Sequence, residues 1–216
     1  MSGAAAPASG PASGPSALAG VLERARTLGF LGPGAIAVHL AHAEGFRVAW
    51  GADPPPLALD LGSGGGVPGL PLALAWPLTE WVLVDAGERR AEFLGQAVAE
   101  LGLGERVGVV RRRAEELGRD PAQRGRYPLV TARSFGSPAV TAECAAPLLA
   151  IGGRLIVSEP PDATGHRWPA AALAGLGLEP ERLIRLQAGY QVLRQVAPCP
   201  ERFPRRSGVP AKRPLF

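Results

Sequence analysis

Cysteine is scarce in this sequence: Cys144 and Cys199 are its two cysteines, too few for a disulfide scaffold or a four-cysteine zinc site. Long apolar runs are also missing, because no stretch approaches the ~18 residues that span a bilayer. The amino terminus, MSGAAAPASG, has no basic start and no apolar segment behind it, so a secretory signal peptide is not expected. These absences favour a soluble cytoplasmic protein.

Asparagine is absent, and lysine occurs once, at Lys212, so arginine supplies the other 22 of the 23 basic residues. Together with 29 glycines and 23 prolines, this composition indicates a GC-rich coding bias, which weakens any inference from arginine content alone. The charged fraction of 19% and the hydrophobic fraction of 46% are typical of a globular chain. The length of 216 residues is enough to bury the core of at least one domain.

The basic charge is concentrated at the carboxyl end. Residues 199–216 carry five basic residues against one acid, a net charge of +4 that equals the net charge of the whole chain. The five are Arg202, Arg205, Arg206, Lys212 and Arg213. A neutral body with a cationic tail suggests contact with a polyanion, and a solvated tail that aids solubility fits the charge equally well.

Composition divides the chain into a low-complexity tail, a helical segment, a main domain and the basic tail, over residues 1–16, 17–53, 57–198 and 199–216. The first of these is rich in Ala, Gly, Ser and Pro and is predicted to be disordered. The helical segment predicts helices over 17–30 and 35–50, separated by Gly32-Pro33-Gly34.

Within the main domain, short apolar runs alternate with helical stretches. Strands are predicted at 57–61, 81–85, 107–110, 129–132 and 154–158, and helices at 87–102, at 139–150 and in a stretch ending at Ala75. This alternation is typical of parallel βαβ units. The runs 182–187 and 190–196 flank Ala188-Gly189 and predict an antiparallel hairpin. The expected fold is a Rossmann-like α/β domain, mainly parallel, with a carboxyl-terminal antiparallel hairpin.

A glycine-rich loop follows the first strand. Residues 64–69 match the dinucleotide pattern G-x-G-x-x-G, while Gly62, Gly64 and Gly66 form G-x-G-x-G two residues after Asp60. A carboxylate is unfavourable beside the pyrophosphate of a dinucleotide, but it suits a cofactor that carries a sulfonium and an ammonium group. Asp60 therefore favours S-adenosylmethionine. Asp85 ends the second strand, where an acid can bond ribose hydroxyls or cap a helix.

The runs DLGSGGGVPGLPLALAWP and LVDAGERRAEFL resemble the ribosomal RNA small subunit methyltransferase G family, also called glucose-inhibited division protein B. The segments 113–116, 130–134, 147–153 and 203–215 agree with it as well, so the likeness covers about residues 57–216. The family resemblance implies a class I methyltransferase that uses S-adenosylmethionine to methylate nitrogen 7 of a guanine in 16S rRNA. Its implied partner is 16S rRNA or the small ribosomal subunit, and the expected protein is a monomer without membrane or metal.

The resemblance also implies a set of site residues. Gly62 and Val67 would line the cofactor pocket, Ala114 and Glu115 would flank the adenine, and Arg133 would lie beside cofactor and target base. The cofactor residues predicted in all are Asp60, Gly62, Gly64, Gly66, Val67, Asp85, Ala114, Glu115 and Arg133. The tail residues predicted to bind RNA are Arg205, Arg206, Lys212 and Arg213. No catalytic base is assigned, because nitrogen 7 has a free lone pair and positioning suffices.

Three features depart from that family. Ser158-Glu159-Pro160 stands where a lysine is usual, Tyr127-Pro128 replaces an acid, and a Tyr-Asn-Leu-Thr-like segment is missing, although a helix around His39 is similar. Three alternatives therefore stay open on the sequence alone. They are a divergent paralogue with another acceptor, a non-catalytic RNA-binding protein with a vestigial pocket, and an NAD-dependent oxidoreductase.

Overall fold

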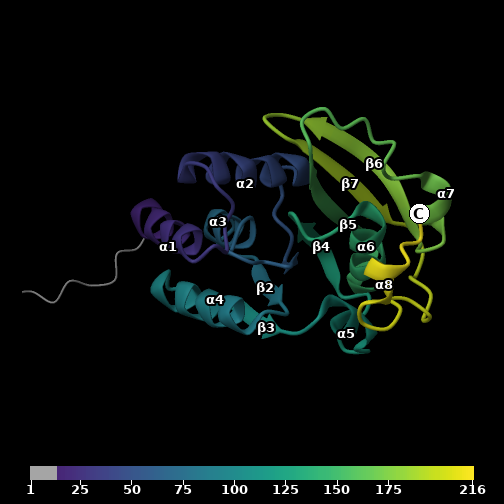
Figure 1. Cartoon of the computed structure of the whole chain (residues 1–216), viewed down its shortest axis with the longest axis horizontal. Coiled ribbons are helices and arrows are strands. Elements are labelled where there is room, and N and C mark those ends of the chain that lie inside the picture. Colours follow the sequence, from purple (N-terminus) through teal and green to yellow (C-terminus); the bar gives the residue numbers. More distant parts are fainter. Residues whose placement is uncertain (1–13) are drawn as a thin grey trace, which may run out of the picture.

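The computed structural model describes residues 14–216. Residues 1–13 of the predicted low-complexity tail lie outside the described residues. A seven-stranded sheet forms the centre of the molecule, in the order β3-β2-β1-β4-β5-β7-β6 (Figure 1). The strands are β1 (Leu57–Leu61), β2 (Glu80–Asp85), β3 (Val107–Arg111), β4 (Tyr127–Ala132), β5 (Leu149–Glu159), β6 (Leu178–Arg185) and β7 (Gly189–Gln195).

Strands β1 to β5 are parallel, and β7 runs antiparallel between β5 and β6. At the centre, Leu59 pairs with Val82 of β2 on one side and with Val130 of β4 on the other. Parallel neighbours require crossover connections, which the helices between these strands supply. The predicted Rossmann-like sheet with its carboxyl-terminal hairpin is confirmed.

Helices cover both faces of the sheet. They are α1 (Pro15–Thr27), α2 (Ile36–Trp50), α3 (Gly69–Ala75), α4 (Glu88–Glu100), α5 (Ala114–Arg119), α6 (Pro138–Ala145), α7 (Ala170–Ala174) and α8 (Val209–Lys212), with a 3₁₀ turn η1 (Ala146–Leu148). Figure 1 shows α1 to α4 gathered on one side and α5, α6 and α8 on the other. None of the helices within residues 14–216 is both long enough and apolar enough to cross a bilayer.

Alternate residues of the strands feed two separate apolar clusters. In β1, Ala58 belongs to the cluster under α1 to α4, whereas Leu59 and Leu61 belong to the cluster under α5 to α7. In β2, Leu83 and Val84 divide in the same way. This period of two is the pleat of a strand that is buried on both faces.

The amino-terminal helices pack on the sheet. The ring of Tyr190, in β7, lies against α2, where a Cβ on Gly45 would come 2.0 Å from the ring. The Tyr190 hydroxyl donates to the carbonyl oxygen of His42 over 2.9 Å. Only a glycine at position 45 allows α2 to approach the sheet this closely, and this approach positions the His39 face of the helix.

Several predicted boundaries differ from the structure. The helix predicted over 139–150 ends at Ala145, and β5 begins at Leu149 rather than at residue 154. Pro147 lacks the N–H that a longer helix would use, and Leu149 pairs instead with Tyr127 of β4. At the other end, α1 begins at Pro15, inside the segment predicted to be disordered.

Residues 199–216, predicted as a basic tail, fold back onto the domain. Phe203 is buried in the cluster under α5 to α7. The Arg124 guanidinium donates to the carbonyl oxygens of Phe203, over 2.7 Å, and Cys199, over 2.8 Å. Figure 1 shows α8 lying beside α6. The tail is therefore part of the folded structure.

Candidate active site

The predicted cofactor residues lie at the carboxyl ends of three neighbouring parallel strands. The glycine loop follows β1, Asp85 ends β2, and Arg133 follows β4. Because these strands are parallel, their carboxyl ends meet at one edge of the sheet, where α/β proteins bind ligands.

Positive backbone angles explain the glycines of the loop. The φ angles of Gly62, Gly64 and Gly66 are 72°, 53° and 88°, in the left-handed region that side chains disfavour. Gly69 is needed for space, since a Cβ there would come 2.8 Å from Asp60 Oδ2. The loop therefore brings bare backbone to the edge of the sheet.

Asp60 lies beneath this loop and is 1% exposed. Its Oδ1 accepts from Thr131 Oγ1 at 2.8 Å, and its Oδ2 accepts from the Gly69 N–H at 3.2 Å. Burial raises the pKa of this carboxyl to about 6, and the hydrogen bonds from Thr131, Ser63 and Gly69 oppose that rise. Asp60, a predicted cofactor residue, anchors the loop and lines none of the hollows described below.

Asp85 connects β2 to the same loop. Its Oδ2 accepts from the Gly64 N–H at 3.0 Å, and its Oδ1 accepts from the Gly87 N–H, at the start of α4, at 2.8 Å. Arg90 Nη1 lies 3.5 Å from Oδ1. The carboxylate is thus held in one orientation at the edge of the first hollow.

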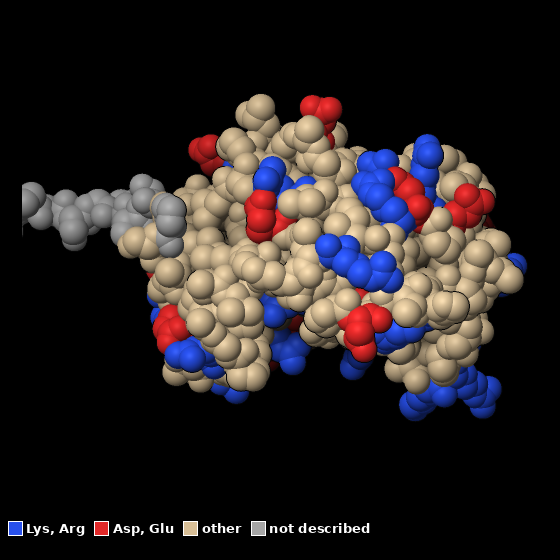
Figure 2. Space-filling model, turned by 90° about the horizontal axis from the view of Figure 1, so that it is seen from above, with Lys and Arg blue, Asp and Glu red and all other residues tan. Residues whose placement is uncertain are grey.

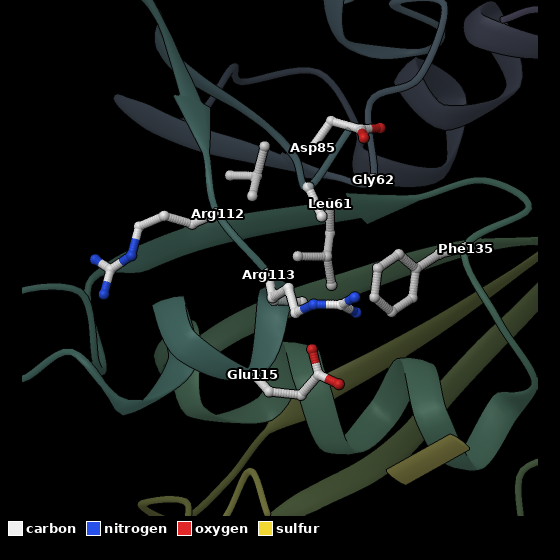
Figure 3. A pocket seen from close by; sticks show the side chains of 10 residues that line it. Leu61, Gly62, Asp85, Arg112, Arg113, Glu115 and Phe135 are labelled. Atoms are coloured by element: carbon white, nitrogen blue, oxygen red, sulfur yellow. The ribbon is translucent and has the colours of Figure 1, made fainter. Parts of the chain in front are cut away.

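A first hollow of about 170 Å³ opens over the ends of β1 and β2. Gly62, Asp85, Ala114 and Glu115, four of the predicted cofactor residues, line it together with Phe135. Figure 3 shows the Arg113 guanidinium reaching toward the Phe135 ring, with the Glu115 carboxylate below it and Arg112 pointing away. Apolar surfaces flanked by two carboxylates suit a nucleoside.

A second hollow of about 290 Å³ adjoins the first at Gly62. The glycine loop, with Gly64 and Val67, forms one wall, and Phe30 and Leu31 from the turn after α1 contribute to the opposite side. Arg133 closes the hollow beside β4. Gly66 lines neither hollow and serves the shape of the loop.

The Arg133 side chain is held by His39. Its Nη2 donates to His39 Nδ1 over 2.8 Å, while His39 Nε2 donates to the carbonyl oxygen of Gly32 over 3.1 Å. Burial, and then the charge of Arg133, lower the pKa of His39, so the imidazole stays neutral and accepts at Nδ1. Arg133 Nη1 is buried and has no partner among the described residues. The sequence showed that the helix around His39 is similar to that of the family, but it could not predict the contact between His39 and Arg133.

The tail reaches the edge of the first hollow. Glu115 Oε1 accepts from the Gly208 N–H at 2.9 Å. Arg205, predicted to bind RNA, instead donates Nε and Nη2 to the buried Glu143 carboxylate, over 2.8 and 2.6 Å. This contact fixes the tail on α6 and occupies the Arg205 guanidinium within the protein.

The other three predicted RNA ligands are the exposed tail cations, Arg206, Lys212 and Arg213. Within residues 14–216 they take part in no ion pair. In the view of Figure 2, basic side chains project at the lower right edge with no acid beside them, while elsewhere on this face both signs mix. Across the described part of the chain, no group of three or more His, Cys, Asp and Glu side chains could hold a metal ion.

Comparison with known sequences identifies relatives. The model of the family described as rRNA small subunit methyltransferase G matches residues 46–159. A protein of that name from Roseiflexus castenholzii is 39% identical over 177 residues, which cover 78% of this chain and 74% of that protein. Its namesake from Symbiobacterium thermophilum is 40% identical over 185 residues, which cover 80% of this chain and 75% of that protein.

Comparison with solved structures agrees on the fold. A putative O-methyltransferase from Klebsiella pneumoniae has a TM-score of 0.61 at 14% identity, covering 86% of this chain and 92% of that one. A protein from Corynebacterium glutamicum has a TM-score of 0.60 at 17% identity, covering 84% and 90%. The solved structures share the fold, and the sequence relatives add the family. This chain belongs to the ribosomal RNA small subunit methyltransferase G family.

Proposed function

We propose that this chain transfers a methyl group from S-adenosylmethionine to nitrogen 7 of a guanine in 16S rRNA. Membership of the family supports rRNA methylation. The observation that carries the cofactor assignment is the buried Arg133 Nη1, which has no protein partner and belongs to a residue that lines the second hollow. A desolvated guanidinium N–H is best satisfied by a carboxylate, such as the one on the methionine end of the cofactor.

The two hollows suit the two halves of S-adenosylmethionine. Adenosine would occupy the first hollow, with Asp85 accepting from the ribose hydroxyls and with Ala114 and Glu115 beside the adenine. The methionine end would lie in the second hollow, along the glycine loop, with its carboxylate on Arg133. A Cβ on Gly64 would come 3.4 Å from the carbonyl oxygen of Phe30, so a side chain there would narrow this hollow.

The loop is a poor match for a dinucleotide. A pyrophosphate needs free backbone N–H groups, and most of those in this loop are already bonded within the protein. The bonded ones are the N–H groups of Gly62, Ser63, Gly64, Gly66 and Gly69. This internal bonding supports S-adenosylmethionine over NAD, because the former carries no phosphate.

The reaction requires the protein mainly to position the methyl donor and the guanine. Bound S-adenosylmethionine supplies a methyl group on a sulfonium, and guanine nitrogen 7 attacks with a lone pair that carries no proton. No general base is therefore needed, and orientation and exclusion of water carry the rate. Arg133, fixed by His39, would hold the methionine end, and Asp85 would hold the ribose. The exposed tail cations would bind RNA phosphates.

Calorimetric titration with S-adenosylhomocysteine tests the cofactor site. We expect micromolar binding by the wild type and no binding of NADH. Arg133→Ala should weaken the affinity by about 10- to 100-fold, the range for a hydrogen bond to a charged group. Arg206→Ala, which changes an exposed arginine of the tail, should leave it unchanged. If S-adenosylhomocysteine does not bind while RNA does, the chain is a non-catalytic RNA-binding protein.

Methylation of small ribosomal subunits that lack the modification tests the acceptor. Borohydride reduction followed by aniline cleaves RNA at 7-methylguanosine, so the product can be mapped to one nucleotide. We expect one new cleavage site in 16S rRNA after incubation with the wild type and S-adenosylmethionine. Methyl incorporation without cleavage would refute nitrogen 7 as the acceptor and leave the cofactor assignment intact.

A further inference from the structure

A third hollow of about 300 Å³ opens at the carboxyl ends of β4 and β5. It shares Phe135 with the first hollow and Ser134 with the second. The Phe135 ring lies directly over Gly62, because a Cβ there would come 2.6 Å from Phe135 Cδ2. The three hollows therefore meet around Gly62, and a group bound in the third faces the junction of the other two.

One wall of the third hollow carries an ion pair between a buried carboxylate and an arginine whose side chain is half exposed. Glu159, at the end of β5, is 6% exposed, and its Oε2 accepts from Arg167 Nη1 at 2.8 Å. Among the described residues no donor reaches its Oε1. Glu159 pairs with Gly189 of β7, where an added Cβ would come 3.1 Å from the Glu159 Cβ. Close packing thus fixes the Glu159 carboxylate beside the Arg167 guanidinium, and Glu159 Oε1 can still accept a hydrogen bond.

Two further features belong to this hollow. Trp168 lines it and is 2% exposed, and its Nε1 is buried with no partner in the part of the chain that the structure describes. Ser134 has a φ of 54°, and it alone of the non-glycine residues in 14–216 has a positive φ. Backbone in this region costs energy for a serine, and residues of this kind cluster at functional sites. On either side of this turn, Arg133 lines the second hollow and Phe135 lies over Gly62, where the three hollows meet.

The donors and acceptors of this wall match one base. The Watson–Crick edge of guanine carries two N–H donors, at N1 and N2, beside the O6 acceptor. A carboxylate oxygen that has no partner in the protein can accept hydrogen bonds from the N1–H and N2–H groups of guanine. A protein N–H group beside that oxygen can donate to O6. Adenine would turn the lone pair of its N1 toward the carboxylate, which is repulsive. Enzymes that modify a base commonly read this edge after flipping the base out of its stack.

We propose that the third hollow, with Glu159, Arg167 and Trp168, is the acceptor pocket and selects guanine by its Watson–Crick edge. This inference rests on the proposed function, because it assumes a purine acceptor beside S-adenosylmethionine. With that edge held at β5, N7, which lies on the neighbouring Hoogsteen edge of the base, has no partner in the wall and is free to face the junction at Phe135. The N7 lone pair forms the new C–N bond as the C–S bond breaks and its electrons return to sulfur. The sulfonium becomes neutral, and the positive charge passes to the base, near Glu159.

Glu159→Gln tests this pocket, because it keeps the shape and removes the charge. We expect kcat/KM for methylation of small ribosomal subunits to fall by about 10- to 100-fold, the effect of a lost hydrogen bond to a charged group. The affinity for S-adenosylhomocysteine should stay that of the wild type. Glu181→Gln is the matched control, since Glu181 also lies on a strand and pairs with an arginine, Arg154, but lines none of the three hollows. This control should keep full activity.

A second measurement needs no variant. An RNA substrate with inosine in place of the target guanosine lacks the N2 amino group, so the wild type should methylate it at least about 10-fold more slowly. Equal rates for guanosine and inosine, or wild-type activity of Glu159→Gln, would overturn the acceptor pocket alone. No transfer by the wild type to any subunit would overturn the proposed function and this inference together.

Discussion

Replacing Arg205 by alanine should destabilise the folded chain and leave its affinity for RNA nearly unchanged. The Glu143 carboxylate that Arg205 contacts is 1% exposed and receives both Nε, over 2.8 Å, and Nη2, over 2.6 Å. Arg205→Ala keeps only the backbone N–H of residue 205, 2.8 Å from Oε1, as a partner for Glu143. Removing one side of a buried ion pair costs about 3 to 5 kcal/mol, because a desolvated charge is left behind.

Thermal unfolding measures this cost. In a domain of this size each kcal/mol changes Tm by about 2 to 4 °C, so Arg205→Ala should melt roughly 6 to 20 °C below the wild type. Arg206→Ala is the matched control, because Arg206 is the adjacent arginine, is exposed and has no ion pair in the described structure. A surface substitution of this kind should change Tm by no more than about 2 °C.

The double variant Arg205→Met with Glu143→Leu separates charge from packing. It removes both members of the pair, and apolar replacements of buried ion pairs are often neutral, so most of the lost stability should return. The opposite pattern would refute the reasoning. If Arg205→Ala melts like the wild type and weakens RNA binding as much as Arg206→Ala does, then Arg205 is a phosphate ligand and Glu143 does not hold the tail.

Three other changes have definite expected results. Replacing all the exposed tail cations by alanine should reduce the slope of log Kd for RNA against log salt by about 2, at an unchanged Tm. Gly64→Val should abolish binding of S-adenosylhomocysteine, measured by calorimetry, because φ is 53° and the side chain would enter the second hollow, while circular dichroism should report a retained fold. The free energy of unfolding, measured with urea, should fall less between pH 7 and pH 4.5 in His42→Leu than in the wild type. Burial lowers the pKa of His42 to about 4, so unfolding takes up a proton below about pH 6.5, and that penalty disappears with the imidazole.

Local patterns predicted the sheet well, because each buried strand is a short apolar run that can be recognised without knowing its partner strands. The run 57–61 is a strand over the full predicted range, and the glycine loop after it has the positive angles that its glycines suggested. The hairpin was also predicted, although β6 begins at Leu178, four residues before the predicted start. The short helices α5 and α7 have too few residues to show a period, and the sequence did not predict them.

Contacts between distant residues could not be predicted from such patterns. Arg133 and His39 are 94 positions apart, and Arg205 and Glu143 are 62 apart, so no local spacing links them. The prediction that Arg205 binds RNA therefore depended on its charge and its place in a basic segment. The structure gives it a buried acid as a partner, and only the fold could bring that acid within reach.

Asp60 was predicted to favour S-adenosylmethionine through its charge, and the structure suggests a different physical reason for the same preference. In β1 the side chain of Asp60 leaves on the face of Ala58 and turns beneath the loop, away from the hollows. There it accepts the N–H of Gly69, as Asp85 accepts the N–H of Gly64. These are donors that a pyrophosphate would need. The two acids disfavour a dinucleotide by occupying the amides of the loop, and they leave a bare backbone surface against which a cofactor without phosphate can lie.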